Sequence, residues 1–384
     1  AYGFAGGGTR AFALAMGWTR GLEMLGAYTS DVNVGAVSGA AWFFGPYHYA
    51  RTEKSILPEY LKPKDCSLES VERRSPLSSA PGRIILDCME RFTVDELLHG
   101  GELGDLWTSV IHGLFLAPFG IGERDLAASS DEQAASTVAR NSRALANETF
   151  ITPRRADLPQ LFAVGSVMGP KNLAPLAEPR LYVPIAFGAD RSGVAVAVNS
   201  VDYAHARQPK KHRIELGGLT ETFAIGSTPL LNKGAEQDVL LPERLFSLAD
   251  AVGVSSLAPA SFVSQVLPFI DDVLISRELW APNATSENFI LGDGGMTENF
   301  GVVPLLQRGA RRLVIFDASV TPLVDRVAWD PVKRDPTSSD MDAYLPSLFG
   351  LDITPDDEFT VLRNNYVFDL KAFAPLMAAL QDAS

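Results

Sequence analysis

Two short stretches decide the fold: Gly6-Gly7-Gly8-Thr9-Arg10 and Gly35-Ala36-Val37-Ser38-Gly39-Ala40. Each follows an apolar run and precedes a helix-like segment, which is the pattern of a strand, a tight turn and a helix. Two such units in succession are typical of neighbouring parallel strands in one sheet, with helices packed on its faces. The sequence therefore predicts an α/β fold with a mostly parallel central sheet.

The rest of the chain adds further strands and helices, without an internal repeat or a flexible linker between domains. The predicted strands are 2–5, 32–37, 181–187, 194–198, 212–216, 286–291 and 312–317, and the predicted helices are 9–25, 40–50, 105–116, 129–146, 249–266 and 303–308. Thr9 is expected to cap the first helix and Gly26 to end it.

We expect residues 1–384 to form a single domain. Residues 51–100 are rich in proline and charge, and residues 51–180 are predicted to be an insertion or cap over the sheet. Only five residues precede the glycine run, too few for a normal first strand. The N-terminus is therefore expected to be trimmed, and a targeting segment upstream of it would not be visible.

The composition argues against several classes of function. A net charge of −13 argues against a nucleic-acid partner and against electrostatic docking to an anionic membrane. The two cysteines, Cys66 and Cys88, and the five histidines show no metal-binding spacing, so we expect no metal. No apolar run reaches the length of a transmembrane helix, and the closest is 110–121. The compartment stays open, with the cytoplasm or a membrane periphery favoured.

The glycine run alone has three interpretations. It can present bare backbone N–H groups to an oxyanion, and it can be a plain tight turn. Gly6, Gly8 and Ala11 also fit the dinucleotide-binding pattern G-x-G-x-x-[GA]. That pattern requires an acidic residue at the end of the next strand, whereas the next strand here ends at Ser38.

Ser38 is the candidate nucleophile. A serine after a strand is usually a helix cap, but the small neighbours Ala36, Gly39 and Ala40 suit the crowded, strained elbow that holds a nucleophilic serine. Asp293 is the candidate base, because it ends a predicted strand and precedes two glycines. No histidine follows His212, so either an earlier histidine or a Ser38–Asp293 dyad completes the site.

The chain resembles the cytosolic phospholipase A2 and lysophospholipase family, relatives of patatin, at four ordered motifs. These are Gly6-Gly7-Gly8-Thr9-Arg10-Ala11 (family G-G-G-x-R-A), Val37-Ser38-Gly39-Ala40-Ala41-Trp42 (L-S-G-S-T-W), Asp105-Leu106-Trp107 (D-L-W-G), and Asp293-Gly294-Gly295-Met296-Thr297-Glu298-Asn299-Phe300 with Pro304 (D-[SG]-G-x-T-x-N-x-P). The chain departs from the family at Ala36, where a glycine usually stands, and at Thr108.

The resemblance implies a three-layer sandwich of the patatin type and assigns roles to individual residues. Ser38 would be the nucleophile and Asp293 the general base, as a dyad without histidine. The N–H groups of Gly7 and Gly8 would form the oxyanion hole. Arg10 would face an anionic head group, and Arg308, followed by Gly309, would be a second substrate-binding arginine.

The expected activity is hydrolysis of a phospholipid or lysophospholipid ester through an acyl-enzyme, with transient contact to a membrane surface. This chemistry needs no cofactor. Trp107, Phe115 and Phe119 are candidates for the wall of an acyl channel, and equally for ordinary core aromatics. The alternatives are a catalytically silent lipid-binding or storage protein of the same fold, a dinucleotide-binding oxidoreductase, and transfer of the acyl group to an alcohol instead of water.

Overall fold

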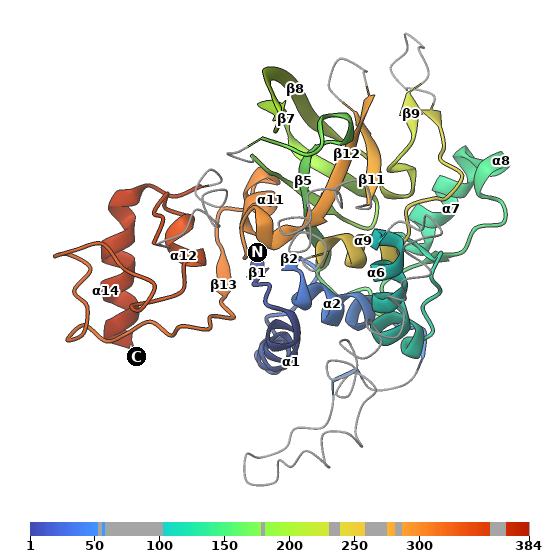
Figure 1. Ribbon diagram of the computed structural model, residues 1–384. Helices are drawn as coiled ribbons and strands as arrows, with labels where there is room; N and C mark the ends of the chain where they lie inside the picture. Colours follow the sequence, from blue (N-terminus) through green and yellow to red (C-terminus); the bar gives the residue numbers. More distant parts are fainter. Residues whose placement is uncertain are drawn as a thin grey trace.

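The computed structural model describes residues 1–52, 56–57, 103–177, 181–229, 239–257, 275–280, 286–353 and 366–383 (Figure 1). Residues 53–55 and 58–102 of the predicted cap lie outside the described ranges, and they include His99 and both cysteines. So does the end of the predicted helix 249–266, from residue 258 onward.

The centre of the described chain is a nine-stranded sheet in the order β13-β1-β2-β5-β6-β7-β8, with β12 on β5 and β11 on β12. The strands are β1 Tyr2–Phe4, β2 Asn33–Val37, β5 Gln160–Pro170, β6 Val183–Phe187, β7 Arg191–His205, β8 Gln208–Glu221, β11 Ser276–Trp280, β12 Ser286–Asp293 and β13 Val314–Phe316. Two smaller sheets pair β3 Leu126–Ala127 with β4 Phe150–Ile151, and β9 Thr228–Pro229 with β10 Val239–Leu240.

The sheet is mixed, and the two kinds of pairing are separated in space. Strands β13, β1, β2 and β5 are parallel neighbours. All other pairs are antiparallel: β6 and β12 pair with β5, β11 pairs with β12, and β7 and β8 continue the sheet beyond β6 as a long hairpin. The prediction of an α/β fold is confirmed, and the two glycine-containing turns lie in the parallel half, as their strand–turn–helix pattern requires.

The position of strand β5 shows that the predicted insertion of residues 51–180 extends too far along the chain. It lies between β2 and β6 in the middle of the sheet, so residues 160–170 belong to the sheet and not to a cap. Its residues are buried on both faces apart from Gln160. A strand buried on both faces is a continuous apolar run without alternation, and this pattern does not distinguish a strand from a loop or helix inside an insertion.

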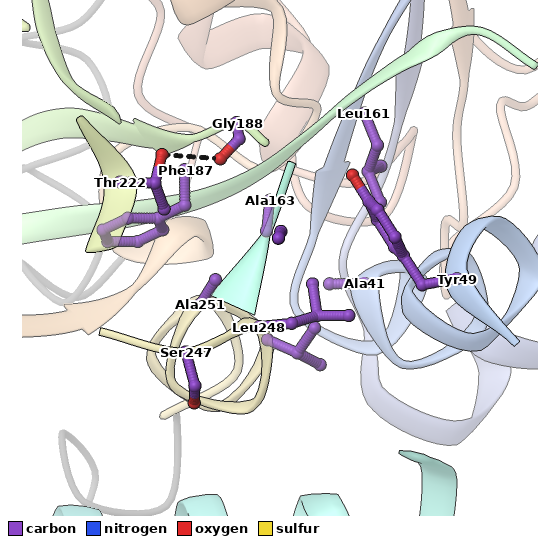
Figure 2. A pocket seen from close by; sticks show the side chains of 12 residues that line it. Ala41, Tyr49, Leu161, Ala163, Phe187, Gly188, Thr222, Ser247, Leu248 and Ala251 are labelled. Carbon is purple, nitrogen blue, oxygen red and sulfur yellow. Dashed lines mark hydrogen bonds between the residues drawn. The ribbon is translucent and has the colours of Figure 1, made fainter. Parts of the chain in front are cut away.

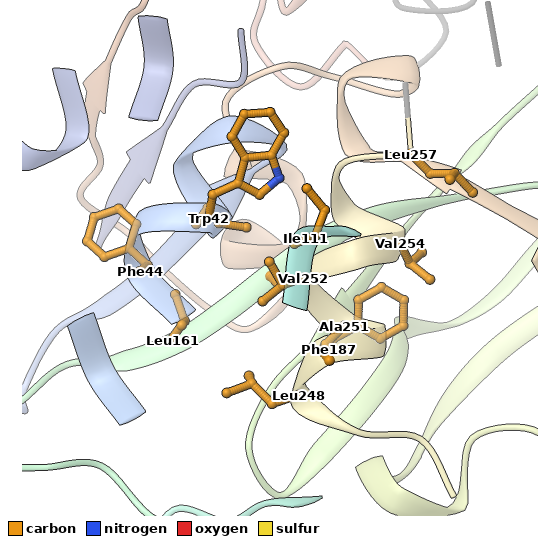
Figure 3. Close-up of a cluster of buried hydrophobic side chains, with 14 of the residues drawn as sticks. Trp42, Phe44, Ile111, Leu161, Phe187, Leu248, Ala251, Val252, Val254 and Leu257 are labelled. Atoms are coloured by element: carbon orange, nitrogen blue, oxygen red, sulfur yellow. The ribbon is translucent and has the colours of Figure 1, made fainter. Parts of the chain in front are cut away.

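Helices cover both faces of the sheet. The helices are α1 Gly8–Met24, α2 Gly39–Tyr49, α6 Leu103–Ile111, α7 Asp131–Arg140, α8 Ser142–Leu145, α9 Leu248–Ser255, α11 Val302–Gln307, α12 Tyr344–Ser347 and α14 Phe373–Ala383. Helices α2 and α9 pack over β2 and β5, and Figure 3 shows the apolar side chains between them. On the other face, Leu305 of α11 packs with Phe162 and Ala186.

The aromatic residues predicted to line an acyl channel lie in this core. Trp107, Phe115 and Phe119 are all buried, and the ring of Phe115 stacks on Trp42 with centroids 5.0 Å apart. The indole N–H of Trp107 donates to Ser256 Oγ at 3.2 Å. Of the two interpretations that the sequence left open for these rings, the core interpretation is the one that the structure supports.

The C-terminal part builds a second apolar cluster beside β13. Trp329, Met341, Phe349, Phe373 and Met377 are buried there together with Ala5, Ala11 and Phe300, which flank the turns after β1 and β12. The last segments of the chain therefore pack against the region where the candidate site lies. In the part of the chain that the structure describes, no helix is long and apolar enough to cross a membrane.

Candidate active site

The pairing of strand β5 brings the candidate nucleophile and base together. Strand β2 runs parallel to β5 and ends with Val37 opposite Val164. Strand β12 runs antiparallel to the same edge of β5 and ends with Asp293 opposite Gly165. The carboxyl ends of β2 and β12 therefore meet head to head at adjacent residues of β5, although Ser38 and Asp293 are 255 positions apart in sequence.

Ser38 stands in a strained turn between β2 and α2. Its φ of 52° and ψ of −120° make it the only non-glycine residue with positive φ among the described residues. Such a backbone costs roughly 1–3 kcal/mol and persists only where the surroundings fix it. Its N–H lies 3.1 Å from both the carbonyl oxygen and the Oγ of Ser255, at the end of α9, which holds the turn in place.

The hydroxyl of Ser38 donates to the carboxylate of Asp293, with Oγ 2.8 Å from Oδ2. Both residues are buried, at 7% and 3% exposure. The other carboxylate oxygen, Oδ1, accepts the N–H of Gly295 at 2.7 Å, which fixes the orientation of the acid. The arrangement is a nucleophile within hydrogen-bond reach of an oriented base, the geometry that general-base activation requires.

Glycine is required where the turns touch. A Cβ on Gly39 would lie 2.0 Å from the carbonyl oxygen of Gly8, and one on Gly6 would lie 3.1 Å from the Cβ of Ser38. A Cβ on Gly294 would lie 2.3 Å from the carbonyl oxygen of Val164. Gly6 and Gly39 thus let the turns after β1 and β2 touch, and Gly294 lets the turn after β12 lie against strand β5.

Asn299 connects two of these turns. Its backbone carbonyl accepts the N–H of Gly6 at 2.9 Å, and its side-chain amide donates to the Gly6 carbonyl at 3.3 Å. The next acid after Asp293, Glu298, is fully buried and accepts the N–H groups of Phe300 (2.8 Å) and Val303 (3.1 Å). Burial raises the pKa of Glu298 to about 7. Glu298 thus holds the start of α11, and with it Asn299.

The N-terminus of α1 presents backbone N–H groups beside Ser38. The helix begins at Gly8, the preceding Gly7 has a φ of 138°, and no described side chain caps it, so the expected capping by Thr9 is wrong. The first N–H groups of an uncapped helix have no partner within the helix and attract negative charge. Since the N–H of Ser38 already faces Ser255, donors for an oxyanion would have to come from elsewhere, and Gly7 and Gly8 are the predicted ones.

The two predicted substrate-binding arginines lie in different places. Arg10 is exposed in the first turn of α1, and its Nε donates to the carbonyl of Ala318 at 2.7 Å, which orients the guanidinium. Arg308 lies beyond the end of α11, with its guanidinium carbon 4.4 Å from the centre of the Phe162 ring. Phe162 pairs with Gly35, so Arg308 lies by the middle of strand β2, whereas Arg10 lies in the turn of α1 that directly follows the glycine run.

The described histidines have other partners. His48 is completely buried at the far end of α2, and its Nε2 lies 2.8 Å from the hydroxyl of Tyr28. Burial, with the charges of Arg154 and Arg155, lowers the pKa of His48 to about 3. His112 contacts the carbonyl of Ile121, His205 accepts the N–H of Arg207, and His212 lies on β8 opposite Tyr203.

Tyr344, at the start of α12, brings the C-terminal part of the chain to the site. Its ring packs against the cluster that contains Ala5 and Ala11, on either side of the glycine run. Burial raises the pKa of the Tyr344 hydroxyl to about 12, and the negative charge of Asp293 acts in the same direction. The sequence alone carries no functional signal at Tyr344 or at Ser255, because only the fold brings these two residues near Ser38 and Asp293.

Comparison with known proteins adds nothing to this geometry. No protein-family model matches the chain, and no curated protein matches it. A proposal of function therefore depends on the motifs and on the arrangement of Ser38, Asp293 and the glycine run.

Proposed function

We propose that this protein is a serine-dependent carboxylic ester hydrolase that acts on lipid esters of the phospholipid or lysophospholipid type. The observation that carries the proposal is the strained Ser38 with its hydroxyl 2.8 Å from the buried carboxylate of Asp293. The resemblance of the four motifs to the cytosolic phospholipase A2 and patatin group supports it. With that resemblance we also propose that the sheet and its helices form a patatin-like three-layer sandwich.

The reaction would proceed in two stages. Asp293 accepts the proton of the Ser38 hydroxyl while Oγ bonds to the ester carbonyl carbon, and the N–H groups of Gly7 and Gly8 stabilise the negative oxygen. The tetrahedral intermediate then collapses, the bond to the alcohol oxygen breaks, and Asp293 returns the proton to the departing alcohol. Water, deprotonated by Asp293, attacks the acyl-enzyme and releases the fatty acid, which restores the Ser38 hydroxyl.

An anionic head group would be drawn to the start of α1. The helix N-terminus and Arg10 both favour negative charge at that point. The chain itself carries a net charge of −13, so attraction to a lipid surface would depend on apolar burial more than on charge.

Two other functions compete with this proposal. A catalytically silent lipid-binding or storage protein would keep the fold without turnover. A dinucleotide-binding oxidoreductase would use the glycine run, but β2 ends at Val37 and is followed by Ser38, not by the acidic residue that a ribose requires. Neither function explains why a strained serine is hydrogen-bonded to a buried, oriented aspartate.

The test is hydrolysis of a neutral short-chain ester and of a lysophospholipid by the wild-type protein and by the Ser38→Ala variant. We expect release of fatty acid from both substrates by the wild type only. Titration of NAD and NADP against the same proteins checks the oxidoreductase alternative. Absence of hydrolysis in a correctly folded wild-type protein would favour the silent lipid-binding alternative.

A further inference from the structure

A polar groove opens to solvent at the end of the sheet opposite to Ser38. It encloses about 520 Å³ and is lined by the last residue of α2, the first residues of β5 and the start of α7. Strand β2 begins with Asn33 opposite Gln160 of β5, which lines the groove, and it ends four residues later at Val37, directly before Ser38. The groove is therefore separate from the candidate active site.

Three carboxylates line the groove. Asp131 and Glu132 lie in the first turn of α7, and Asp190 lies in the turn between β6 and β7. One oxygen of each aspartate is used by the fold: Oδ1 of Asp131 accepts the hydroxyl of Thr152 at 2.9 Å, and Oδ1 of Asp190 accepts the N–H of Ser129 at 2.8 Å. These bonds fix the two carboxylates in place and leave further lone pairs on each for a ligand.

The one cationic side chain among the described lining residues, Arg155, does not offset this charge. Its Nη2 lies 2.7 Å from Oε1 of Glu23 and its Nε lies 3.2 Å from Oδ1 of Asp157, and neither of these acids lines the groove. The groove therefore repels an anion and attracts a cation. Nowhere in the described part of the chain do three or more histidine, cysteine or acidic side chains converge as they would around a metal ion. An organic cation fits better than a metal ion.

Tyr49, the last residue of α2, adds a hydroxyl group without a partner. Its side chain is 3% exposed, and Figure 2 shows the ring extending toward Leu161 of β5, which also lines the groove. The hydroxyl forms no hydrogen bond within the described part of the chain. Burial and the negative charge of Asp190 raise the pKa of Tyr49, so the hydroxyl stays neutral. Since buried polar groups normally have a partner, this hydroxyl points to a ligand in the groove.

We infer that this groove binds a small organic cation, an alkyl chain with two or more amino groups, through Asp131, Asp190 and Tyr49. An ammonium group donates three hydrogen bonds and accepts none, which matches two carboxylates and a hydroxyl oxygen as acceptors. Leu158 and Leu161 also line the groove and offer apolar contact to the methylenes between the amines. A sugar would need an exposed aromatic face to stack on, whereas the one aromatic ring among the described lining residues is that of the buried Tyr49.

The experiment is a calorimetric titration of the purified protein with spermidine at neutral pH and low salt. We expect the wild type to bind spermidine at one site. Asp190→Asn keeps an acceptor for the Ser129 N–H but loses the charge, so the affinity should fall at least about tenfold. Tyr49→Phe keeps the ring and removes only the hydroxyl, so the affinity should fall about fivefold. Asp131→Asn, with an expected loss of about tenfold, is the second charge variant if Asp190→Asn does not fold.

The matched controls are Tyr203→Phe and Asp202→Asn, neighbours on β7 that do not line the groove. Tyr203 is 4% exposed, and its hydroxyl, like that of Tyr49, has no partner within the described part of the chain. Asp202 is an exposed acid. Both variants should bind spermidine as the wild type does, because the hydroxyl and the charge that they remove lie outside the groove.

Three results would overturn the inference. The first is a folded wild-type protein that binds no spermidine. The second is an affinity that Asp190→Asn and Tyr49→Phe leave unchanged, or that Asp202→Asn lowers equally, since spermidine would then only follow the net charge of −13. The third is binding of a neutral disaccharide that depends on Tyr49, without binding of spermidine, which would make the groove a sugar site. The titrations involve no ester, so their outcome does not depend on the hydrolase proposal.

Discussion

Ser38 and Ser247 both stand directly before a buried helix, yet their side chains act in opposite ways. Ser247 has an extended backbone, and its Oγ accepts the N–H of Asp250 at 3.1 Å to form a complete capping box at the start of α9. Ser38 has a positive φ, makes no capping bond with α2, and donates its hydroxyl to Asp293 instead. The difference shows that the backbone conformation of the turn, and not the residue type, decides whether a serine caps the helix or hydrogen-bonds to a neighbouring acid.

The largest expected effect concerns Asp293, the acid to which the Ser38 hydroxyl donates. Asp293→Asn keeps the size of the side chain but cannot accept the Ser38 proton, so kcat should fall by about a hundredfold to ten-thousandfold with a smaller change in KM. Ester hydrolysis by the purified variant, with its folding checked by circular dichroism, measures this.

The matched controls are alanine variants of the five histidines. Each of His48, His99, His112, His205 and His212 should remain active when replaced, provided that the variant folds. One histidine as indispensable as Ser38, or near-normal turnover by folded Asp293→Asn, would restore the triad interpretation.

The other end of α2 offers a test of stability against pH. The folded-state pKa of His48, about 3, lies below its unfolded value of about 6.5, so its contribution to stability is complete above pH 6.5 and is lost as the pH falls toward 3. Between pH 7 and pH 4 the free energy of unfolding should drop by about 3 kcal/mol more in the wild type than in His48→Gln. Urea titrations at the two pH values check this, and parallel pH profiles would contradict the buried, neutral state of His48.

The start of α1, where Arg10 lies, has no serine cap, and substitutions of Arg10 test its role in binding. Arg10→Ala should reduce the rate on a lysophospholipid by about tenfold, because a charge-assisted hydrogen bond to the phosphate is lost, and should change a neutral ester much less. Arg10→Lys should retain part of the rate through its charge but lose the bond from Nε to Ala318. Equal losses on both substrates would leave Arg10 with a structural role only.

The smallest expected effect is on the free energy of unfolding, which we compare between variants of Ser247 and of Ser38. Ser247→Ala removes a helix cap and should lower the free energy of unfolding by about 1 kcal/mol. Ser38→Ala removes no cap, and Ser38→Gly should be about 1 kcal/mol more stable than Ser38→Ala, because glycine adopts the positive φ without strain. Denaturant unfolding of the three variants measures this. If Ser38→Ala were as destabilising as Ser247→Ala, Ser38 would be a structural residue.

The parts of the fold that depend on local pattern could be predicted from the sequence. The turns at the glycine run and at Ser38 follow from small residues between apolar runs, and the structure places both where the pattern predicts. The sequence does not predict strand β5, because its buried residues show no alternation of apolar and polar side chains. Yet β5 is the strand that aligns Val37 with Asp293. The motifs could therefore suggest that nucleophile and base meet, whereas the contact itself depends on a strand that the local pattern does not reveal.

The position of Arg308 also depends on more than the local pattern. It is near the Asp293 loop in sequence, but α11 carries the chain away from the loop by about 9 Å over its six residues before Arg308 is reached. Ser255 and Tyr344 were missed because nothing in their local sequence differs from an ordinary helix end or a buried aromatic. Their proximity to Ser38 and Asp293 depends on long-range packing alone.

The central claim is that the Ser38 hydroxyl is an activated nucleophile, and covalent labelling tests it most directly. The protein is incubated with a fluorophosphonate, digested, and the modified peptide is identified by mass spectrometry. We predict one adduct on Ser38 in the wild type, labelling at least about a hundredfold slower in Asp293→Asn, and none on Ser247. A folded wild-type protein that acquires no adduct on Ser38, or acquires it equally fast without Asp293, would contradict this claim.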